Sequence, residues 1–311
     1  MSGVRVIALI GFGEVGQILC DDLLAQCGVR VRAWDTAFAN PGSGPSAAAR
    51  ERRACVAGMD YPAGQPVVIE GVLAAPSSAA AVAGADLVIS AVTADQTLLA
   101  AETAAAAIGP GAFFLDLNSS SPGRKIDAAA VIEAAGGRYV EAAVMSPIGP
   151  KRIASPMLLG GPHTEAFLAA ADGLGFAGAR PYADVVGRAA ATKLCRSVMI
   201  KGIEALLAES LLAARHYGVE QVVLDSLSDL LPLPDWPAKA QYMISRSVEH
   251  GVRRAEEMRE AARTVAEAGI APTMSLAAAE RQAWAAARRS ALSPDLATML
   301  DAVIRDMEAS A

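Results

Sequence analysis

The chain has 311 residues, of which 53% are hydrophobic and 19% are charged, and its formal net charge is -6. This composition excludes a disordered chain, and the length is sufficient for two domains. The negative charge and the scattered lysines and arginines argue against a nucleic-acid partner.

The sequence has none of the features expected for export, membrane insertion or metal binding. The N-terminus runs directly into an apolar strand, without the basic, apolar and cleavage regions of a signal peptide. Charged residues interrupt each apolar stretch before it reaches the roughly 20 residues that a membrane span needs. The four cysteines have no CxxC spacing, and the three histidines are far apart. We therefore expect a cytoplasmic protein with reduced thiols, no membrane contact and no metal site.

Strands and helices alternate over the first half of the chain. Residues 4–11 (VRVIALIG) are a nearly continuous apolar run, which is typical of a strand buried on both faces. Residues 14–27 repeat apolar positions at helical spacing up to Gly28, and residues 29–35 (VRVRAWD) predict a second strand. Further strands are predicted at residues 86–92, 112–118, 138–144 and 156–161. This alternation favours an α/β fold with a Rossmann-type, doubly wound, mostly parallel sheet covered on both faces.

The second half of the chain is predicted to be helical. After about residue 184 the strand signal stops, and residues 185–216 predict one long helix, made mostly of Ala, Leu, Ile, Val and Met. Further helices are predicted at residues 251–269, 275–290 and 294–308. We therefore expect an α/β domain over residues 1–184 and an all-helical domain over residues 185–311, joined by the long helix.

A glycine-rich loop follows the first predicted strand. Residues 11–16 (GFGEVG) match G-x-G-x-x-G, where Gly11 allows a tight turn and Gly13 allows close approach of a pyrophosphate. Gly16 allows the helix to pack closely on the strand, and the helix N-terminus then meets the phosphate charge. Asp35 ends the next strand, 19 residues after Gly16, where a carboxylate can accept hydrogen bonds from ribose hydroxyls.

These features predict a nicotinamide dinucleotide site in the first domain. Its residues are expected to be Gly11, Phe12, Gly13, Glu14, Val15, Gly16, Asp35, Val92 and Thr93. The Asp35 carboxylate disfavours a 2′-phosphate, so NAD is expected. NADP remains possible because nearby arginines lie within or before residues 40–66, a segment for which no helix or strand is predicted. These arginines are Arg32, Arg50, Arg52 and Arg53. The alternative is a tight strand–turn–helix connection beside an exposed aspartate.

Polar side chains interrupt the long apolar helix. Lys193, Ser197 and Lys201 are four residues apart and form one stripe on its surface. A lysine in apolar surroundings can exchange a proton with a hydroxyl near neutral pH, as hydride transfer from an alcohol to a nicotinamide requires. The alternative is that these lysines reach the helix edge or pair with Glu204 or Glu209.

Four segments occur in the order of one enzyme family. They are GFGEVGQ (11–17), DLNSSSP (116–122), EAAVMSP (141–147) and GRAAATK (187–193). Together they resemble the β-hydroxyacid dehydrogenase family, the relatives of 6-phosphogluconate and 3-hydroxyisobutyrate dehydrogenases. The resemblance implies an NAD(P)-dependent oxidoreductase that acts on a small 3-hydroxy acid, with Lys193 as the general acid/base.

The resemblance also implies that Ser119 and Ser120 hold the substrate beside the nicotinamide. Their position after a strand and just before Pro122 supports this independently, because hydroxyls and backbone N–H groups at a helix start bind anions. The alternative is an N-cap cluster for a helix at residues 122–136.

Ser197, Lys201 and His250 complete the predicted substrate site. Arg253 and Arg254 follow His250, and this basic cluster could close over an anionic substrate. The alternative is a solvated face in which these residues pair with nearby acids at helical spacing. Those acids are Glu256, Glu257 and Glu260.

The sequence departs from the family pattern in three places. Ser197 stands where most members have Asn, and Ala189 replaces a Gly. Met145-Ser146-Pro147 replaces S-G-G, and proline has no N–H to offer a carboxylate. These departures indicate a divergent branch with its own C-terminal helical domain, so the substrate of better-known members does not transfer.

The leading interpretation is an NAD(P)-dependent 3-hydroxyacid dehydrogenase, with a dinucleotide-binding domain followed by a domain for substrate binding and dimerisation. A homodimer is expected because so long an apolar helix is rarely covered within one subunit. One alternative is an imine reductase-like enzyme, although such enzymes usually have an acid or a tyrosine in place of Lys193. Another is a non-catalytic dinucleotide-binding sensor.

Overall fold

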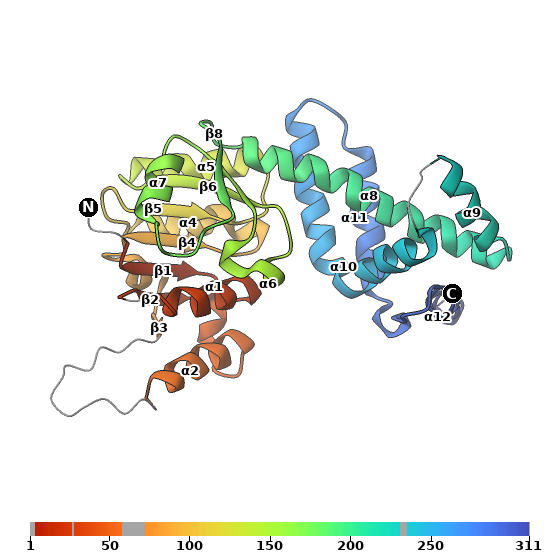
Figure 1. Ribbon diagram of the computed structural model, residues 1–311, viewed down its shortest axis with the longest axis horizontal. Coiled ribbons are helices and arrows are strands. Elements are labelled where there is room, and N and C mark those ends of the chain that lie inside the picture. Colours follow the sequence, from red (N-terminus) through yellow and green to blue (C-terminus); the bar gives the residue numbers. More distant parts are fainter. Residues whose placement is uncertain (1–3, 27, 58–71, 231–234, 311) are drawn as a thin grey trace. The chain divides into compact units, whose positions relative to one another are not determined.

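The computed structural model describes residues 4–26, 28–57, 72–230 and 235–310 (Figure 1). The chain divides into two compact units, Met1–Lys193 and Leu194–Ala311. The boundary lies within the long helix α8 (Arg188–His216), whereas the sequence placed it between residues 184 and 185. No described helix is long and apolar enough to cross a membrane.

The first unit is built on an eight-stranded sheet with the order β3-β2-β1-β4-β5-β6-β7-β8. The strands are β1 (Val6–Ile10), β2 (Arg30–Trp34), β3 (Leu73–Ala74), β4 (Leu87–Ser90), β5 (Phe113–Asp116), β6 (Arg138–Val144), β7 (Met157–Gly160) and β8 (Ala179–Ala183). Only β6 and β7 pair antiparallel among the described strands. The predicted Rossmann-type, mostly parallel sheet is therefore confirmed. β3 and β8 escaped prediction because β3 has only two residues and β8 is largely exposed.

Helices lie on both faces of this sheet (Figure 1). They are α1 (Glu14–Leu24), α2 (Gly44–Ala57), α3 (Ser78–Val82), α4 (Thr97–Ala105), α5 (Pro122–Ala134), α6 (Ile148–Lys151) and α7 (Thr164–Ala170), with the 3-10 turns η1 (Thr36–Ala39), η2 (Ala94–Gln96) and η3 (Arg152–Ala154). The side chains of β1 alternate between the two faces. Ile7 and Leu9 pack with Leu19 of α1, whereas Ala8 packs with Ala104 of α4. Each fully buried side chain of the size of Leu contributes about 1.5–3 kcal/mol, so this double burial explains the continuous apolar run of the strand.

Helix α2 occupies part of the segment for which the sequence predicted no element. Alanine and arginine, which are frequent between residues 44 and 57, favour helices, but the segment lacks a clear apolar stripe. The Ser43 Oγ accepts a hydrogen bond of 3.2 Å from the Ser46 N–H and helps to start the helix. Residues 58–71 lie outside the described residues.

The second unit contains helices packed around its own core. After α8 these are α9 (Glu220–Leu230), α10 (Trp236–Glu267), α11 (Thr273–Ala286), the 3-10 turn η4 (Arg289–Ala291) and α12 (Leu296–Ser310). Leu211, Ile244 and Leu300 lie in the buried cluster. Helices α10 and α11 approach closely at Gly251, where a Cβ atom would come within 2.2 Å of the Gln282 carbonyl oxygen.

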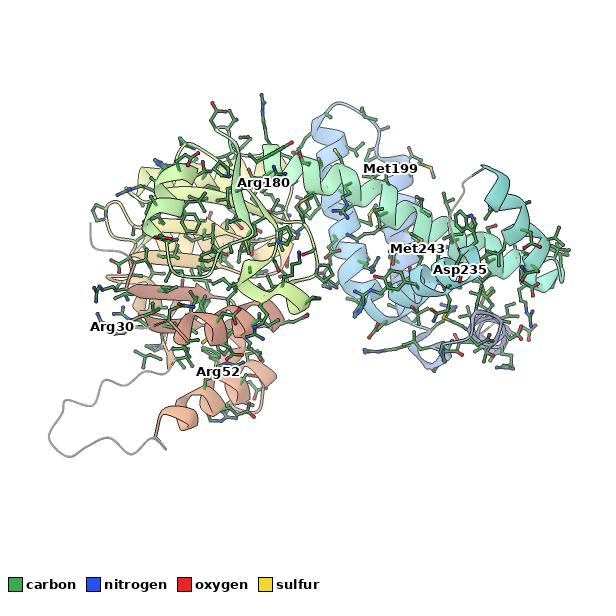
Figure 2. The ribbon with its side chains drawn as sticks, in the orientation of Figure 1. Arg30, Arg52, Arg180, Met199, Asp235 and Met243 are labelled. Carbon is green, nitrogen blue, oxygen red and sulfur yellow. The ribbon has the colours of Figure 1, made fainter. Side chains whose placement is uncertain are left out.

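Helix α10 begins earlier than the sequence predicted. The prediction placed its start at residue 251, whereas the helix starts at Trp236 and is capped by Asp235 (Figure 2). The Asp235 carboxylate accepts a hydrogen bond of 2.9 Å from the Ala238 N–H. His250 has non-helical angles (φ -119°, ψ 15°), so the prediction found only the part of the helix beyond this kink.

Candidate functional site

The glycine-rich loop joins β1 to α1 at the carboxyl edge of the sheet. Gly11 has φ +92°, and a Cβ atom there would come within 2.3 Å of the Ala91 carbonyl oxygen. A Cβ atom on Gly16 would come within 2.1 Å of the Gly11 carbonyl oxygen. Gly13, in contrast, has no heavy atom within 4 Å of such a Cβ, and as N-cap of α1 it offers no side chain. The loop therefore leaves open space in front of a helix N-terminus, which fits a pyrophosphate.

Asp35 ties the end of β2 to this loop. One carboxylate oxygen accepts a hydrogen bond of 2.7 Å from the Phe12 N–H, and the other accepts one of 2.7 Å from the Ala37 N–H. Each carboxylate oxygen can accept more than one hydrogen bond, so these contacts still allow ribose hydroxyls to bind. The residues predicted beside them, Glu14 and Val15, form the first turn of α1.

Val92 and Thr93 follow β4, the strand next to β1, at the point where the strand order reverses. The Val92 side chain lies beside the loop, since a Cβ on Gly11 would come within 3.0 Å of it. The Val92 N–H donates a hydrogen bond of 2.7 Å to the Asn118 side chain. Ligands of doubly wound sheets bind at this reversal, so the predicted cofactor residues converge where the fold favours a dinucleotide.

Two of the four arginines that could favour NADP have partners elsewhere in the first unit. Arg32 donates a hydrogen bond of 2.5 Å to the Ala83 carbonyl oxygen. Arg52 forms an ion pair of 2.6 Å with Asp21 (Figure 2 labels Arg52). The Arg53 side chain lies outside the described part of the structure.

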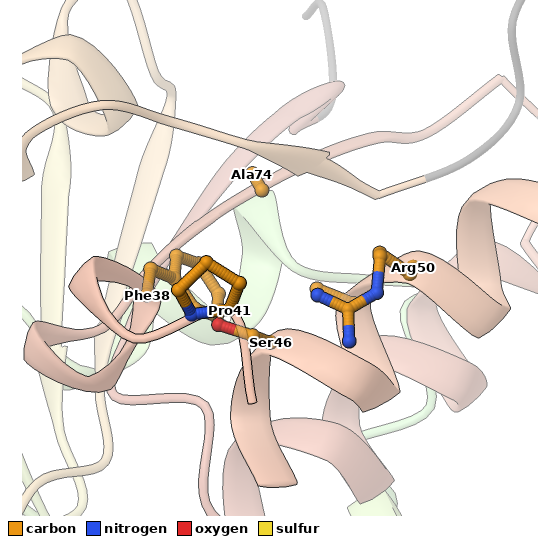
Figure 3. Close-up of a pocket in the computed structure, with 6 residues that line it drawn as sticks. Phe38, Pro41, Ser46, Arg50 and Ala74 are labelled. Carbon is orange, nitrogen blue, oxygen red and sulfur yellow. The ribbon is translucent and has the colours of Figure 1, made fainter. Parts of the chain in front are cut away.

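Arg50 lies at a pocket of about 200 Å³ between α2 and the end of β3 (Figure 3). The pocket is lined by Phe38, Pro41, Ser46, Ala49, Arg50 and Ala74. Figure 3 shows Phe38, Pro41 and Ser46 on one side of it and Arg50 on the other.

Lys193 and Ser119 meet within the first unit. The Lys193 Nζ donates a hydrogen bond of 2.6 Å to the Ser119 Oγ, and both side chains are half-buried. Ser120 is fully buried, and its Oγ has no hydrogen-bond partner within the described structure. Because buried hydroxyls are nearly always hydrogen-bonded, an unpaired one is unusual, and the role of Ser120 toward substrate stays a prediction.

The N-cap of α5 is a different serine from the two predicted to bind substrate. The Ser121 Oγ accepts a hydrogen bond of 3.5 Å from the Arg124 N–H and caps the helix. Ser119 and Ser120 make no such cap, so the capping alternative applies to their neighbour.

Two buried carboxylates near this pair had no role predicted from the sequence. Asp116 and Glu141 are both fully buried, and Asp116 forms an ion pair of 2.7 Å with the buried Lys125. Burial raises the pKa of Glu141, while the charge of Lys125 lowers it. An acidic residue that ends the apolar run of a buried strand, as Asp116 does in FFLD, was the available signal.

Three further residues predicted to bind substrate belong to the second unit. The Lys201 ammonium forms an ion pair of 2.6 Å with Glu257 and donates a hydrogen bond of 3.3 Å to the Ser197 Oγ. His250 lies 2.5 Å from an Arg246 nitrogen, and its pKa is lowered by burial and then by Arg246. These three side chains thus have partners within their own unit, and their role toward substrate stays a prediction.

Of the basic residues beside His250, Arg253 pairs with an acid at helical spacing, as the alternative interpretation expected, whereas Arg254 pairs with an acid of α8 that this interpretation did not name. Arg253 forms an ion pair of 3.2 Å with Glu257, and Arg254 pairs with Glu204. Within the described ranges, no three side chains of His, Cys, Asp or Glu are grouped to hold a metal ion.

Two family models match the chain. The NAD binding domain of 6-phosphogluconate dehydrogenase matches residues 6–182. A domain of unknown function, DUF1932, matches residues 214–285. The curated proteins give no match to this chain.

Solved structures resemble the chain over nearly its whole length. A conserved hypothetical protein from Sinorhizobium meliloti 1021 is 35% identical, with a TM-score of 0.74 over 98% of this chain and 97% of that chain. The conserved protein MTH1747 of unknown function, described as structurally similar to 3-hydroxyacid dehydrogenases, is 27% identical, with a TM-score of 0.64 over 90% of this chain and 97% of that chain. A Mycobacterium tuberculosis 3-hydroxyisobutyrate dehydrogenase shares the fold, with 21% identity and a TM-score of 0.68 over 96% of this chain and 99% of that chain.

Proposed function

Because this chain belongs to the β-hydroxyacid dehydrogenase family of NAD(P)-binding oxidoreductases, we propose that it transfers a hydride between a nicotinamide dinucleotide and a small 3-hydroxy acid. The observation that carries this proposal is the 2.6 Å hydrogen bond from the Lys193 amine to the Ser119 hydroxyl. This bond brings the Lys193 amine, which can donate or accept a proton, to the segment predicted to bind substrate beside the predicted cofactor loop. The description of MTH1747, which names 3-hydroxyacid dehydrogenases, supports the same substrate class.

The residues of the first unit fit a dinucleotide. The open space at Gly13 and the N-terminus of α1 would hold the pyrophosphate, and the Asp35 carboxylate would accept hydrogen bonds from the adenosine ribose. When bound, the oxidised cofactor supplies an acceptor for the hydride that leaves the carbinol carbon.

Lys193 is the general acid/base of this reaction. In the oxidation direction its neutral amine accepts the proton of the substrate hydroxyl, and in the reduction direction its ammonium donates that proton to the oxygen. Ser119, which already bonds to this amine, holds the substrate oxygen in line with it, and the unpaired Ser120 hydroxyl donates to the substrate carboxylate. Such positioned proton transfer contributes typically 10²–10⁴-fold to a rate.

The same proposal favours NAD over NADP. Asp35 places a negative charge where the 2′-phosphate of NADP would lie, and two like charges close together repel. The ion pair of Arg52 with Asp21 supports this preference, because it engages one of the arginines that could bind a phosphate.

The proposal is tested by following NADH formation with a panel of 3-hydroxy acids. The wild type is compared with Lys193→Met, and Lys239→Met, which removes an exposed lysine of α10, serves as control. We expect Lys193→Met to lower kcat by about 10²-fold or more, with NAD affinity and the control unchanged.

Two outcomes would point to other functions. Tight NAD binding without turnover of any panel member would support a dinucleotide sensor. Faster consumption of reduced cofactor with a cyclic imine than with any 3-oxo acid would support an imine reductase.

We also propose that the protein is a cytoplasmic homodimer formed through its second unit. Exposed apolar side chains on α8 and α10 support this, since Met199 is 64%, Leu206 57% and Val252 67% exposed. Sedimentation of a monomer at micromolar concentration would contradict the dimer.

A further inference from the structure

The carboxylate of Glu141 lies at the N-terminus of the helix that carries Lys193. One of its oxygens accepts a hydrogen bond of 2.7 Å from the Gly187 N–H, and the other accepts one of 2.6 Å from the Ala190 N–H. Backbone N–H groups in the first turn of a helix have no partner within the helix, and a negative charge there is favourable. Ala190 precedes Lys193 by three residues, so the lysine extends from the same side of α8 one turn later.

Gly160 makes room for this carboxylate. Glu141 of β6 pairs with Gly160 of β7, and a Cβ atom on Gly160 would come within 2.4 Å of a Glu141 carboxylate oxygen. The Glu141 side chain therefore extends over β7 toward α8 through space that only glycine leaves open.

Asp116 holds the other partner of the Lys193–Ser119 pair. It is in register with Glu141 across the β5–β6 pairing. One Asp116 oxygen accepts a hydrogen bond of 2.8 Å from the Asn118 N–H, directly before Ser119, and the other accepts one of 2.6 Å from the Tyr139 hydroxyl. Asp116 and Glu141, which are paired across two strands, thus fix the chain segments that carry Ser119 and Lys193.

Both oxygens of Glu141 are used on a single helix turn. A buried carboxylate costs free energy unless its oxygens are hydrogen-bonded, and here the two described hydrogen bonds come from Gly187, directly before α8, and from Ala190 in its first turn. The carboxylate therefore specifies where the first turn of this helix lies on the sheet.

We propose that Glu141 is a positioning residue, which places the Lys193 amine at Ser119 by fixing the first turn of α8 through the Gly187 and Ala190 N–H groups. This inference rests on the proposed function of Lys193 as the general acid/base. Glu141 itself takes no part in proton transfer, because its carboxylate faces the helix backbone.

Two variants test the proposal in different ways. Glu141→Gln keeps the volume but turns an NH₂ group toward one of the two N–H donors, so one bond is lost. Gly160→Ala keeps the Glu141 carboxylate but displaces it. Because the two variants act differently, one of them still tests the proposal if the other fails to fold. Asp86→Asn is the control for the loss of a carboxylate charge, because one Asp86 oxygen accepts two backbone N–H groups, from Arg5 and Val6 at 2.9 and 2.8 Å, at the opposite edge of the sheet.

The first readout does not need turnover. The rate at which Lys193 is acetylated is measured by peptide mass spectrometry between pH 7 and 10, relative to the exposed Lys239 in the same sample. We expect both test variants to change the relative rate at least about threefold, because the amine leaves Ser119, and the control to leave it unchanged even if Tm falls. Unchanged rates in folded test variants would overturn the proposal.

The second readout is kinetic. With a turned-over hydroxy acid, Glu141→Gln and Gly160→Ala should lower kcat by about 10–100-fold while the Kd for NAD stays the same, because a misplacement near 1 Å costs about this much. If the wild type oxidises no panel member but the labelling rates change, the dehydrogenase proposal fails and the positioning stands. If Lys193→Met abolishes turnover but folded Glu141→Gln keeps the wild-type kcat, the positioning is wrong.

Discussion

Lys193 and Ser119 are 74 residues apart in the chain, yet the amine of one lies 2.6 Å from the hydroxyl of the other. The strand order explains this contact. Ser119 follows β5, and α8 starts where Glu141 of the adjacent β6 caps it, so the two segments meet at one edge of the sheet. The positions of both residues therefore depend on the tertiary structure.

Removing the Ser119 hydroxyl should weaken the site without unfolding the protein. A hydrogen bond to a charged group contributes about 1.5–3 kcal/mol, so Ser119→Ala should lower kcat/KM by roughly 10–150-fold. Steady-state kinetics with the preferred hydroxy acid measure this change. Ser226→Ala, which removes an exposed hydroxyl of α9 in the second unit, is the control. Equal kcat/KM in all three proteins would contradict a role of Ser119.

Two glycines of the cofactor loop should separate binding from stability. A Cβ on Gly13 meets no atom within 4 Å, so Gly13→Ala should keep Tm within about 2 °C but raise the Kd for NAD at least about tenfold. A Cβ on Gly16 would come within 2.1 Å of the Gly11 carbonyl oxygen, so Gly16→Ala should lower Tm clearly. Thermal scans and calorimetric titration with NAD measure both quantities. A dinucleotide Kd that is unchanged in Gly13→Ala would argue against this loop as the phosphate site.

Asp35 should determine the choice between NAD and NADP. Asp35→Asn removes the negative charge and keeps an oxygen for one of the two N–H donors, Phe12 or Ala37. The ratio of Kd for NADP to Kd for NAD should fall at least about tenfold, because the repulsion of the 2′-phosphate is lost. Asp22→Asn, which removes a carboxylate of α1 that pairs with Arg152, is the control. A wild type that binds NADP more tightly than NAD would refute this assignment at once.

The buried ion pair of Lys125 and Asp116 should dominate the stability of the first unit. Lys125→Met leaves the Asp116 carboxylate buried without its counter-ion, which costs about 3–5 kcal/mol. Arg253→Met breaks an exposed pair with Glu257 and should cost less than about 1 kcal/mol. Urea unfolding gives the free energies of unfolding. Similar losses of unfolding free energy in the two variants would mean that the buried pair contributes no more to stability than the exposed one.

Cys20 should be unreactive in the folded protein. Burial raises the pKa of this thiol to about 12, although the charge of Arg52 lowers it. At pH 8, well below that pKa, the thiol stays protonated, and only the thiolate reacts with iodoacetamide. Peptide mass spectrometry should find the exposed Cys195 alkylated in native protein and Cys20 alkylated only after denaturation. Rapid alkylation of native Cys20 would show that α1 opens readily.

The sequence alone was sufficient for the features that depend on local patterns. The apolar run of β1 predicted a strand buried on both faces, and the glycine spacing predicted the loop beside it. Strand–helix alternation predicted the doubly wound sheet, and the order of four motifs predicted the family. The strand, the loop and the sheet rest on periodicity or on backbone angles that a few neighbouring residues determine, and the family rests on short motifs that are each local.

Other features depended on contacts that short patterns do not encode. The sequence missed β3, which has two residues, and began α10 after its kink at His250. It assigned no role to Asp116 or Glu141, because the register between β5 and β6 decides which backbone groups these carboxylates reach. The sequence thus determined which residue types could carry the chemistry. Only the tertiary structure decided which of them meet, because strand order and register bring distant segments to one edge of the sheet.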